Sequence, residues 1–234
     1  MASTEHTPKR QYLWEMIAIV VFGVGVISFV DAVLMPPYAV KSAIKILLFF
    51  GIPLLYGKFF HKELDLITLF RFRNAKKGIR DALLWGCGVF LLIIGAYLLI
   101  GRFFDFSQIC SNMESAMGIH KGNFIFVVLY ISFFNSLLEE FFFRGFACLR
   151  LQKYASKRFS YCFSSFLFAL YHTAMMWIAF EPPLVILSLV GLFVGGFIFN
   201  YFNQKYQNLY ISWLIHMGAN FAINGIGLHF MYQS

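Results

Sequence analysis

The chain has 234 residues, of which 60% are hydrophobic, 20% are aromatic and 13% are charged. Soluble domains contain about 45–50% apolar and about 25% charged residues, so this composition excludes an ordinary soluble domain and indicates an integral membrane protein. The net charge of +8 would suit nucleic acid. However, the basic residues stand between apolar runs, which is typical of loops at the cytoplasmic face of a membrane, so no nucleic-acid partner is expected.

The apolar runs predict an all-α polytopic membrane protein with about seven transmembrane helices, because a spanning helix needs about 20 mostly apolar residues. Pro36-Pro37 and Pro182-Pro183 separate neighbouring runs, since proline cannot continue a helix. The loops leave no room for a soluble domain, so residues 1–234 are expected to form a single integral membrane domain surrounded by lipid. The predicted spans are 13–35, 38–57, 82–101, 123–146, 159–180, 184–203 and 208–230.

Lysine and arginine in the short loops predict the orientation of the chain. The segment 58–81 is the most basic loop, and it predicts either a short amphipathic helix on the membrane surface or a plain basic anchor loop. A second basic loop, 150–158, lies on the same side if the spans alternate. The N-terminus is therefore expected in the cytoplasm and the C-terminus outside, with a bacterial cell membrane as the expected location.

Two adjacent glutamates lie inside the fourth apolar run, in the sequence Leu138-Glu139-Glu140-Phe141. A carboxylate within a membrane is costly unless it is paired or used, so it marks a functional site. On a helix, Glu140 and Arg144 share a face and can pair, whereas Glu139 points about 100° away. Glu140 and Arg144 are therefore expected to be structural, and Glu139 is expected to be free to act on water or to bind a metal.

Two histidines lie in later apolar runs: His172 follows Phe168 by four residues, and His216 precedes Asn220 by four. The members of each pair share a helix face, so Phe168 is expected to support His172 by packing. The imidazole of His216 beside the amide of Asn220 can bind water or stabilise an oxyanion. Glu139, His172 and His216 also have the composition of a catalytic zinc site, so one zinc ion and a metal-free carboxylate site are both open.

Other functions fit the sequence less well. An aspartyl intramembrane protease needs two aspartates within spans, and only Asp31 lies near one; a serine protease of the rhomboid type needs a GxSx-type serine, and Ser136 is expected to be a packing residue. Lys45 is expected to snorkel to the interface or to pair, and His229 to be a helix-contact residue. A proton-coupled transporter could use the same residue types, but the chain lacks the internal repeat of many transporters.

In chain order, the three elements are Glu139-Glu140-x-x-x-Arg144, Phe168-x-x-x-His172 and His216-x-x-x-Asn220. This ordered set resembles the motifs EExxxR, FxxxH and HxxxN of the CAAX-protease and bacteriocin-processing family, also called the Abi family of intramembrane proteases, and it covers residues 139–220. The resemblance implies hydrolysis of a peptide bond inside the membrane. It also implies that Glu139 activates the water with help from His172, and that His216 and Asn220 hold the oxyanion.

The same resemblance indicates the class of partner. Members of the family act on prenylated C-terminal tails, process or resist peptide bacteriocins, or serve as scaffolds that bind sensor kinases. The expected substrate is therefore a membrane-associated peptide or protein, lipidated in some members, and a membrane sensor kinase is a further expected partner. The family has been described with and without a catalytic metal, so the zinc ion stays open. The alternative function is a non-proteolytic membrane scaffold or a bacteriocin self-immunity protein.

Overall fold

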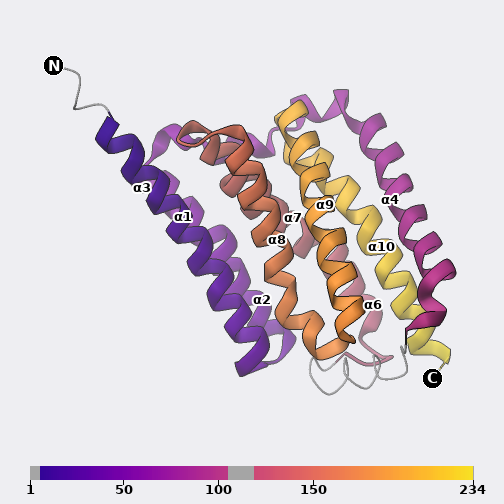
Figure 1. The fold of residues 1–234 in the computed structure, drawn as a ribbon. Coiled ribbons are helices and arrows are strands. Elements are labelled where there is room, and N and C mark those ends of the chain that lie inside the picture. Colours follow the sequence, from indigo (N-terminus) through magenta and orange to yellow (C-terminus); the bar gives the residue numbers. More distant parts are fainter. Residues whose placement is uncertain (1–5, 105–118, 234) are drawn as a thin grey trace.

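The computed structural model describes residues 6–104 and 119–233, and every regular element within these ranges is helical (Figure 1). The all-α class is therefore confirmed for this part of the chain. The α-helices are α1 (His6–Phe29), α2 (Tyr38–Ile46), α3 (Ile52–Phe59), α4 (Ile79–Ile100), α6 (Phe124–Leu129), α7 (Ser136–Glu139), α8 (Lys157–Ala179), α9 (Pro182–Tyr206) and α10 (Leu209–Gln233).

Shorter helical segments of other geometry interrupt or extend these helices. The π-helical segments are η1 (Val30–Leu34), η2 (Leu47–Gly51), η7 (Tyr130–Asn135) and η8 (Glu140–Arg150). The 3₁₀ segments are η3 (Lys62–Leu64), η4 (Leu66–Phe70), η5 (Phe72–Lys77), η6 (Gly101–Phe103) and η9 (Leu151–Lys153).

Five stretches of the described chain are long and apolar enough to cross a membrane: Lys9–Leu34, Tyr38–Phe59, Ile79–Phe103, Phe124–Lys153 and Pro182–Tyr206. Helices α8 and α10 have 23 and 25 residues but are not among the five, and both carry several polar side chains, His172 and His216 included. The predicted count of seven spans is therefore not confirmed. The several apolar helices nevertheless fit an integral membrane protein.

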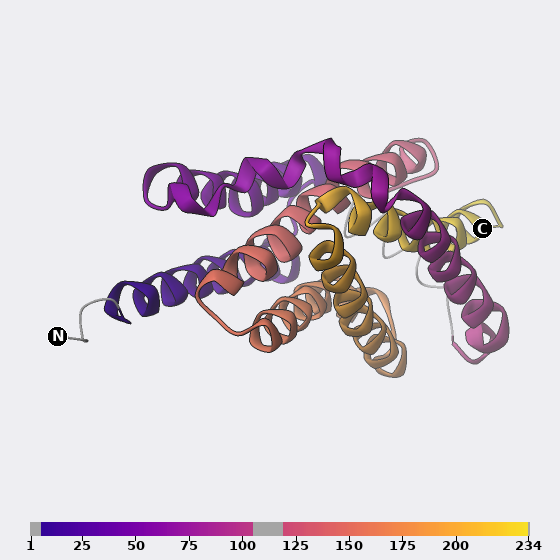
Figure 2. The same cartoon turned by 90° about the horizontal axis from the view of Figure 1, so that it is seen from above.

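The long helices run alternately between the two ends of the bundle, so that the N-terminal and C-terminal ends lie at opposite ends (Figure 1). Helix α8 packs against α9, η8 and α1, and α10 packs against α4. From above, the connection between α3 and α4 crosses one end of the bundle (Figure 2). This arrangement brings the central part of the chain, from α7 to η8, between α8 and α10, which carry the predicted histidines.

The connection between α3 and α4 is neither of the two forms predicted for residues 58–81. It consists of the three 3₁₀ segments η3, η4 and η5 instead of one amphipathic helix or a plain loop. Leu64, Leu66 and Leu69 are buried at 0%, 4% and 1% exposure. These three leucines therefore face protein, whereas Ile67 and Phe72 of the same segment are 74% and 57% exposed.

Basic side chains from separate loops meet at this same end. Nη2 of Arg150 donates to the carbonyl of Asp65 at 2.7 Å and to Oγ1 of Thr68 at 2.8 Å. Nζ of Lys205, near the end of α9, donates to Oδ2 of Asp81 at 2.8 Å. The contacts fasten the ends of η8 and α9 to the crossing segment and to the start of α4, so the basic loops share one face as the charge pattern predicts.

Phenylalanines form the centre of the bundle. Phe141, Phe142, Phe143 and Phe146 of η8 are fully buried, and Phe49 of η2 stacks on Phe142 with ring centroids 4.1 Å apart. The outer surface is also apolar: the leucines of α4 that face outward are between 55% and 73% exposed, namely Leu83, Leu84, Leu91, Leu92, Leu98 and Leu99. Such a large exposed apolar surface marks an interaction site, here the contact with lipid tails.

Two glycines let α4 and α10 approach closely. A Cβ atom placed on Gly218 of α10 would lie 2.4 Å from the carbonyl oxygen of Gly86 in α4. Real Cβ atoms do not approach that closely, so only glycine fits at this crossing. Small residues serve this purpose in membrane helix packing generally. Because Gly218 lies between His216 and Asn220, this crossing also sets where the two polar side chains of α10 are placed.

Candidate functional site

Glu139 and Glu140 lie where α7 passes into the π-helical segment η8. Both side chains are buried, at 2% and 0% exposure. The predicted fourth span ended at residue 146, whereas the helical chain continues to Lys153. Within η8 each N–H bonds to a carbonyl five residues back instead of four, so the 100° rotation per residue assumed from the sequence does not hold after Glu140. Such π-helical turns are frequent at functional sites.

Glu140 has two charged or polar partners on different elements. Its Oε1 accepts a hydrogen bond from Nδ1 of His216 at 2.9 Å and lies 3.5 Å from Nη1 of Arg144. The predicted pairing of Glu140 with Arg144 is therefore present as an ion pair. The link to His216 joins η8 to α10, and spacing along one helix could not reveal it.

Arg144 is fully buried against aromatic rings. Its Cζ lies 3.8 Å from the ring centroid of Phe168, 4.8 Å from that of Phe199 and 5.9 Å from that of Phe143. A desolvated cation over an aromatic face gains about 2 kcal/mol. Among the described residues, none forms a hydrogen bond with the three guanidinium nitrogens. The charge of Arg144 is therefore balanced by Glu140 and by the faces of these rings.

Glu139 has several partners of its own. Its Oε1 accepts hydrogen bonds from Nδ2 of Asn135 at 2.7 Å and from the hydroxyl of Tyr171 at 3.0 Å. Nζ of Lys45 lies 3.4 Å from the same oxygen. The other carboxylate oxygen, Oε2, faces Nε2 of His216 at 3.8 Å. One oxygen of Glu139 is thus anchored by three groups, and the other faces a histidine.

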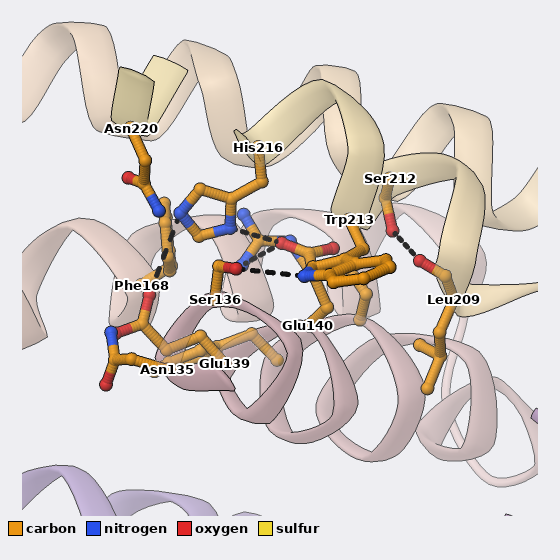
Figure 3. A network of polar contacts seen from close by, with 12 residues as sticks. Asn135, Ser136, Glu139, Glu140, Phe168, Leu209, Ser212, Trp213, His216 and Asn220 are labelled. Carbon is orange, nitrogen blue, oxygen red and sulfur yellow. Dashed lines mark hydrogen bonds and ion pairs between the residues drawn. The ribbon is translucent and has the colours of Figure 1, made fainter. Parts of the chain in front are cut away.

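His216 lies between the two adjacent glutamates. Figure 3 shows it projecting from α10 toward the helix that carries Glu139 and Glu140, with Asn220 further along the same side of α10. Nδ2 of Asn220 lies 3.4 Å from the carbonyl of Ile131 in η7. The ring of His216 stacks on Phe199 with centroids 5.1 Å apart. His216 and Asn220 therefore project from the same side of α10, and His216 reaches both glutamates.

His172 belongs to the same cluster through Phe168. Nδ1 of His172 lies 2.7 Å from the carbonyl of Phe168, and the two ring centroids are 4.8 Å apart. A carbonyl can only accept, so Nδ1 carries the proton and Nε2 offers its lone pair. Phe168 also lies beside His216, with the ring centroids 5.7 Å apart. Glu139 interacts electrostatically with both histidines. Phe168 therefore packs against both imidazoles and against Arg144.

Ser136 has the packing role expected of it. It is fully buried, and its Oγ accepts a hydrogen bond from Nε1 of Trp213 at 3.0 Å (Figure 3). The Oγ also donates to the carbonyl of Ser132 at 2.5 Å. The bond from Trp213 connects α7 to α10 beside the glutamates, whereas the bond to Ser132 stays within the same run of helix. Ser136 is therefore engaged in helix contacts on both sides.

The zinc set considered from the sequence does not fit this arrangement. Within the described residues, no group of three or more histidine, cysteine or acidic side chains is placed to hold a metal ion. The ammonium of Lys45 lies against Glu139. A cation at that carboxylate would repel a second, divalent cation. No step of the proposed chemistry below passes through a metal.

Three further polar residues at the site were not predicted to act there: Lys45, Asn135 and Tyr171. Lys45 was expected to snorkel or to pair, and it pairs with Glu139. Asn135 precedes Glu139 by four residues in an apolar run, a spacing that could have indicated it. Tyr171 carries no spacing signal, because it is one residue before His172. Asp31 is buried and pairs with Lys41 at 2.6 Å.

Comparison with known proteins agrees with the motifs. Residues 121–222 match the family model described as type II CAAX prenyl endopeptidase Rce1-like. The matched segment contains all three motifs, so the resemblance inferred from them is confirmed. No curated protein and no solved structure matches the chain. The match ends before the last residues of α10 and begins after α1 to α4, so the N-terminal helices lie outside it.

Proposed function

With residues 121–222 assigned to the Rce1-like family, we propose that the chain is an intramembrane endopeptidase that hydrolyses a peptide bond of a membrane-associated peptide or protein. The proposal rests on the contacts of the two carboxylate oxygens of Glu139. Three groups anchor its Oε1, while its Oε2 faces Nε2 of His216 at 3.8 Å. A buried carboxylate held in this way has one oxygen available to take a proton from water.

We propose that two acceptors of the site share one water molecule. Oε2 of Glu139 is an acceptor, and the lone pair on Nε2 of His172 is another, because Nδ1 of that ring donates to the carbonyl of Phe168. A water with its two hydrogens directed at these atoms has its own lone pair free to attack a carbonyl carbon. Glu139 is the general base in this proposal, and His172 orients the water.

The hydrolysis balances with these groups alone. The water oxygen bonds to the carbonyl carbon while its proton moves to Glu139, and the carbonyl oxygen becomes an oxyanion. The C–N bond then breaks, and the proton on Glu139 passes to the leaving amine. The products are a carboxylic acid and an amine, which become a carboxylate and an ammonium when the acid passes its proton to the amine, and Glu139 is ionised again. General base catalysis of this kind contributes about 10²–10⁴-fold to the rate.

His216 and Asn220 are the proposed oxyanion donors. Nδ1 of His216 donates to Glu140, so a second donor at Nε2 requires the doubly protonated ring. Glu139 and Glu140 flank this ring, so in this proposal they balance the charge of the doubly protonated form. Nδ2 of Asn220 has only a long contact, 3.4 Å, with the carbonyl of Ile131, and a substrate oxyanion is a stronger acceptor.

The family name points to a substrate class, the lipidated C-terminal tail of a protein or peptide. We propose a substrate of this kind for the present chain, with its lipid in the bilayer beside the apolar outer helices. The test is comparative peptidomics of cells that carry the wild-type chain or the Glu139→Gln variant. C-terminal peptides released only in the wild-type cells support the proposal. Identical peptide sets contradict proteolysis and favour the non-proteolytic scaffold.

A further inference from the structure

Lys45 is a buried cation from a helix outside the matched family segment. It lies on α2, is 5% exposed, and belongs to an apolar stretch that is long enough to cross a membrane. Lysine in such a stretch is costly unless it is paired. Its Nζ contacts Glu139 of α7 and Tyr171 of α8. Helix α2 therefore supplies a charged group to a site whose motif residues all come from residues 139–220.

The ammonium of Lys45 is enclosed by three acceptors. Nζ donates to Oδ1 of Asn135 at 2.7 Å, to the hydroxyl oxygen of Tyr171, and to Oε1 of Glu139 at 3.4 Å. An ammonium has three N–H donors, so its hydrogen-bonding capacity is used within the protein. The face of the Tyr171 ring adds a cation–π contact at 4.8 Å. Lys45 is thus fixed in place and does not reach toward the interface.

The partners of Lys45 are also the partners of Glu139. Asn135 and Tyr171 each accept a hydrogen bond from Lys45 and each donate one to Oε1 of Glu139. The four side chains form a closed cluster in which every contact with Glu139 is made to the same oxygen. Rotation of the carboxylate would break all of these contacts together. The cluster therefore holds one carboxylate oxygen, Oε1, and leaves the other, Oε2, facing His216.

We propose that Lys45 is a positioning residue: it holds Glu139 ionised and oriented, with Oε2 as the oxygen that takes the proton from water. The inference rests on the proposed function and extends it to a residue of α2. Lys45 acts only through Glu139, Asn135 and Tyr171, because its donors are all engaged by these residues. It is therefore expected to change the chemical step and not the binding of substrate.

The nearby Lys41 provides a matched control. It also lies on α2, four residues earlier, but its Nζ pairs with Asp31 at 2.6 Å. The double variant Asp31→Asn, Lys41→Met removes a buried ion pair of similar kind from the same region without touching Glu139. A general loss of packing or membrane insertion around α2 would affect this control as much as a change at Lys45.

The experiment compares the purified wild-type chain, Lys45→Met, Lys45→Arg and the control in detergent micelles, with a farnesylated peptide ending in a CAAX sequence as the probe. We expect Lys45→Met to lower kcat about 100-fold with KM unchanged, because a misplaced base slows only the chemical step. Lys45→Arg keeps the positive charge, so its kcat is expected to lie between those of Lys45→Met and the wild type. The control is expected to cleave like the wild type.

A thermal unfolding cycle accompanies the kinetics, with Lys45→Met, Glu139→Gln and the double variant. Groups in one ion-pair network give non-additive changes, so the double variant is expected to be more stable than the sum of the single variants predicts. Additive shifts, or a folded Lys45→Met protein with wild-type kcat, would overturn the positioning role while leaving the protease intact. A wild-type chain that cleaves nothing would instead contradict the proposed function, and the positioning role with it.

Discussion

Nδ1 of His216 lies 2.9 Å from Oε1 of Glu140. Glu140 therefore orients the histidine whose Nε2 faces Glu139. This relationship gives the two glutamates different roles. Glu139→Gln is expected to abolish cleavage and to keep most of the stability, since Lys45 can lose a proton when its partner is neutral. Glu140→Gln leaves Arg144 unbalanced, and a guanidinium cannot lose its proton. Thermal unfolding and cleavage measured on both variants separate these outcomes; equal losses of stability would contradict this distinction.

Removal of Arg144 is expected to destabilise the fold strongly. Arg144→Met leaves Glu140 without its counter-charge in a fully buried position, which costs about 3–5 kcal/mol. The double variant Arg144→Met, Glu140→Gln removes both charges and is expected to recover part of this loss. The measurement is the free energy of unfolding in mixed micelles. A single variant as stable as the wild type would show that the ion pair does not support the fold.

The crossing of α4 and α10 is expected to tolerate no side chain at Gly218. A Cβ there would lie 2.4 Å from the carbonyl oxygen of Gly86, so Gly218→Ala must push α10 away and displace His216 and Asn220. Cleavage is expected to fall by about 100-fold, the cost of misplacing catalytic groups by about 1 Å. Gly225→Ala on the same helix is the control, because no atom of the described residues lies within 4 Å of its added Cβ. Equal activity of the two variants would contradict the prediction.

Metal dependence can be decided by elemental analysis. The described donor atoms do not gather as a zinc site, and Lys45 lies against the carboxylate that would bind the ion. Purified active protein is therefore expected to carry much less than one equivalent of zinc, and chelators are expected to leave its activity unchanged. About one tightly bound equivalent, with activity lost on chelation and restored by zinc, would require a different arrangement of Glu139, His172 and His216.

The orientation in the membrane is open to cysteine labelling. Lys62 is exposed in the segment between α3 and α4 at the basic end, and Lys121 is exposed just before α6. In a background without the native cysteines, Lys62→Cys is expected to react only with reagent on the cytoplasmic side, since basic loops stay in the cytoplasm. Lys121→Cys is expected to react only from outside. The reverse pattern would invert the proposed topology.

Much of this protein can be predicted from local properties of the sequence. Composition and the length of the apolar runs indicate a helical membrane protein, because in lipid the backbone N–H and C=O groups must be hydrogen-bonded within the spanning segment, as they are in a helix. The motif residues stand out for a similar reason. Glu139, His172 and His216 are costly in apolar surroundings, so each is visible without knowledge of its neighbours. The ordered motifs then indicate a family resemblance, which the family-model match over residues 121–222 supports, although the motifs do not test the role of any single residue.

The partners of these residues depend on tertiary structure. Whether Lys45 snorkels or pairs depends on how α2 packs beside α7 and α8. The spacing of residues along the chain does not reveal the distance from Lys45 to side chains on those helices. Tyr171 carries no sequence signal and is placed by the same packing.

The geometry of the glutamates also depends on the folded chain. The sequence rule of 3.6 residues per turn predicts a free Glu139, but a π-helical segment begins at Glu140, and three side chains hold one oxygen of Glu139. Sequence periodicity determines which face of a helix a residue occupies. Helix crossings, such as the contact of Gly86 with Gly218, determine which side chains that face contacts, because they bring together residues that are far apart in the chain.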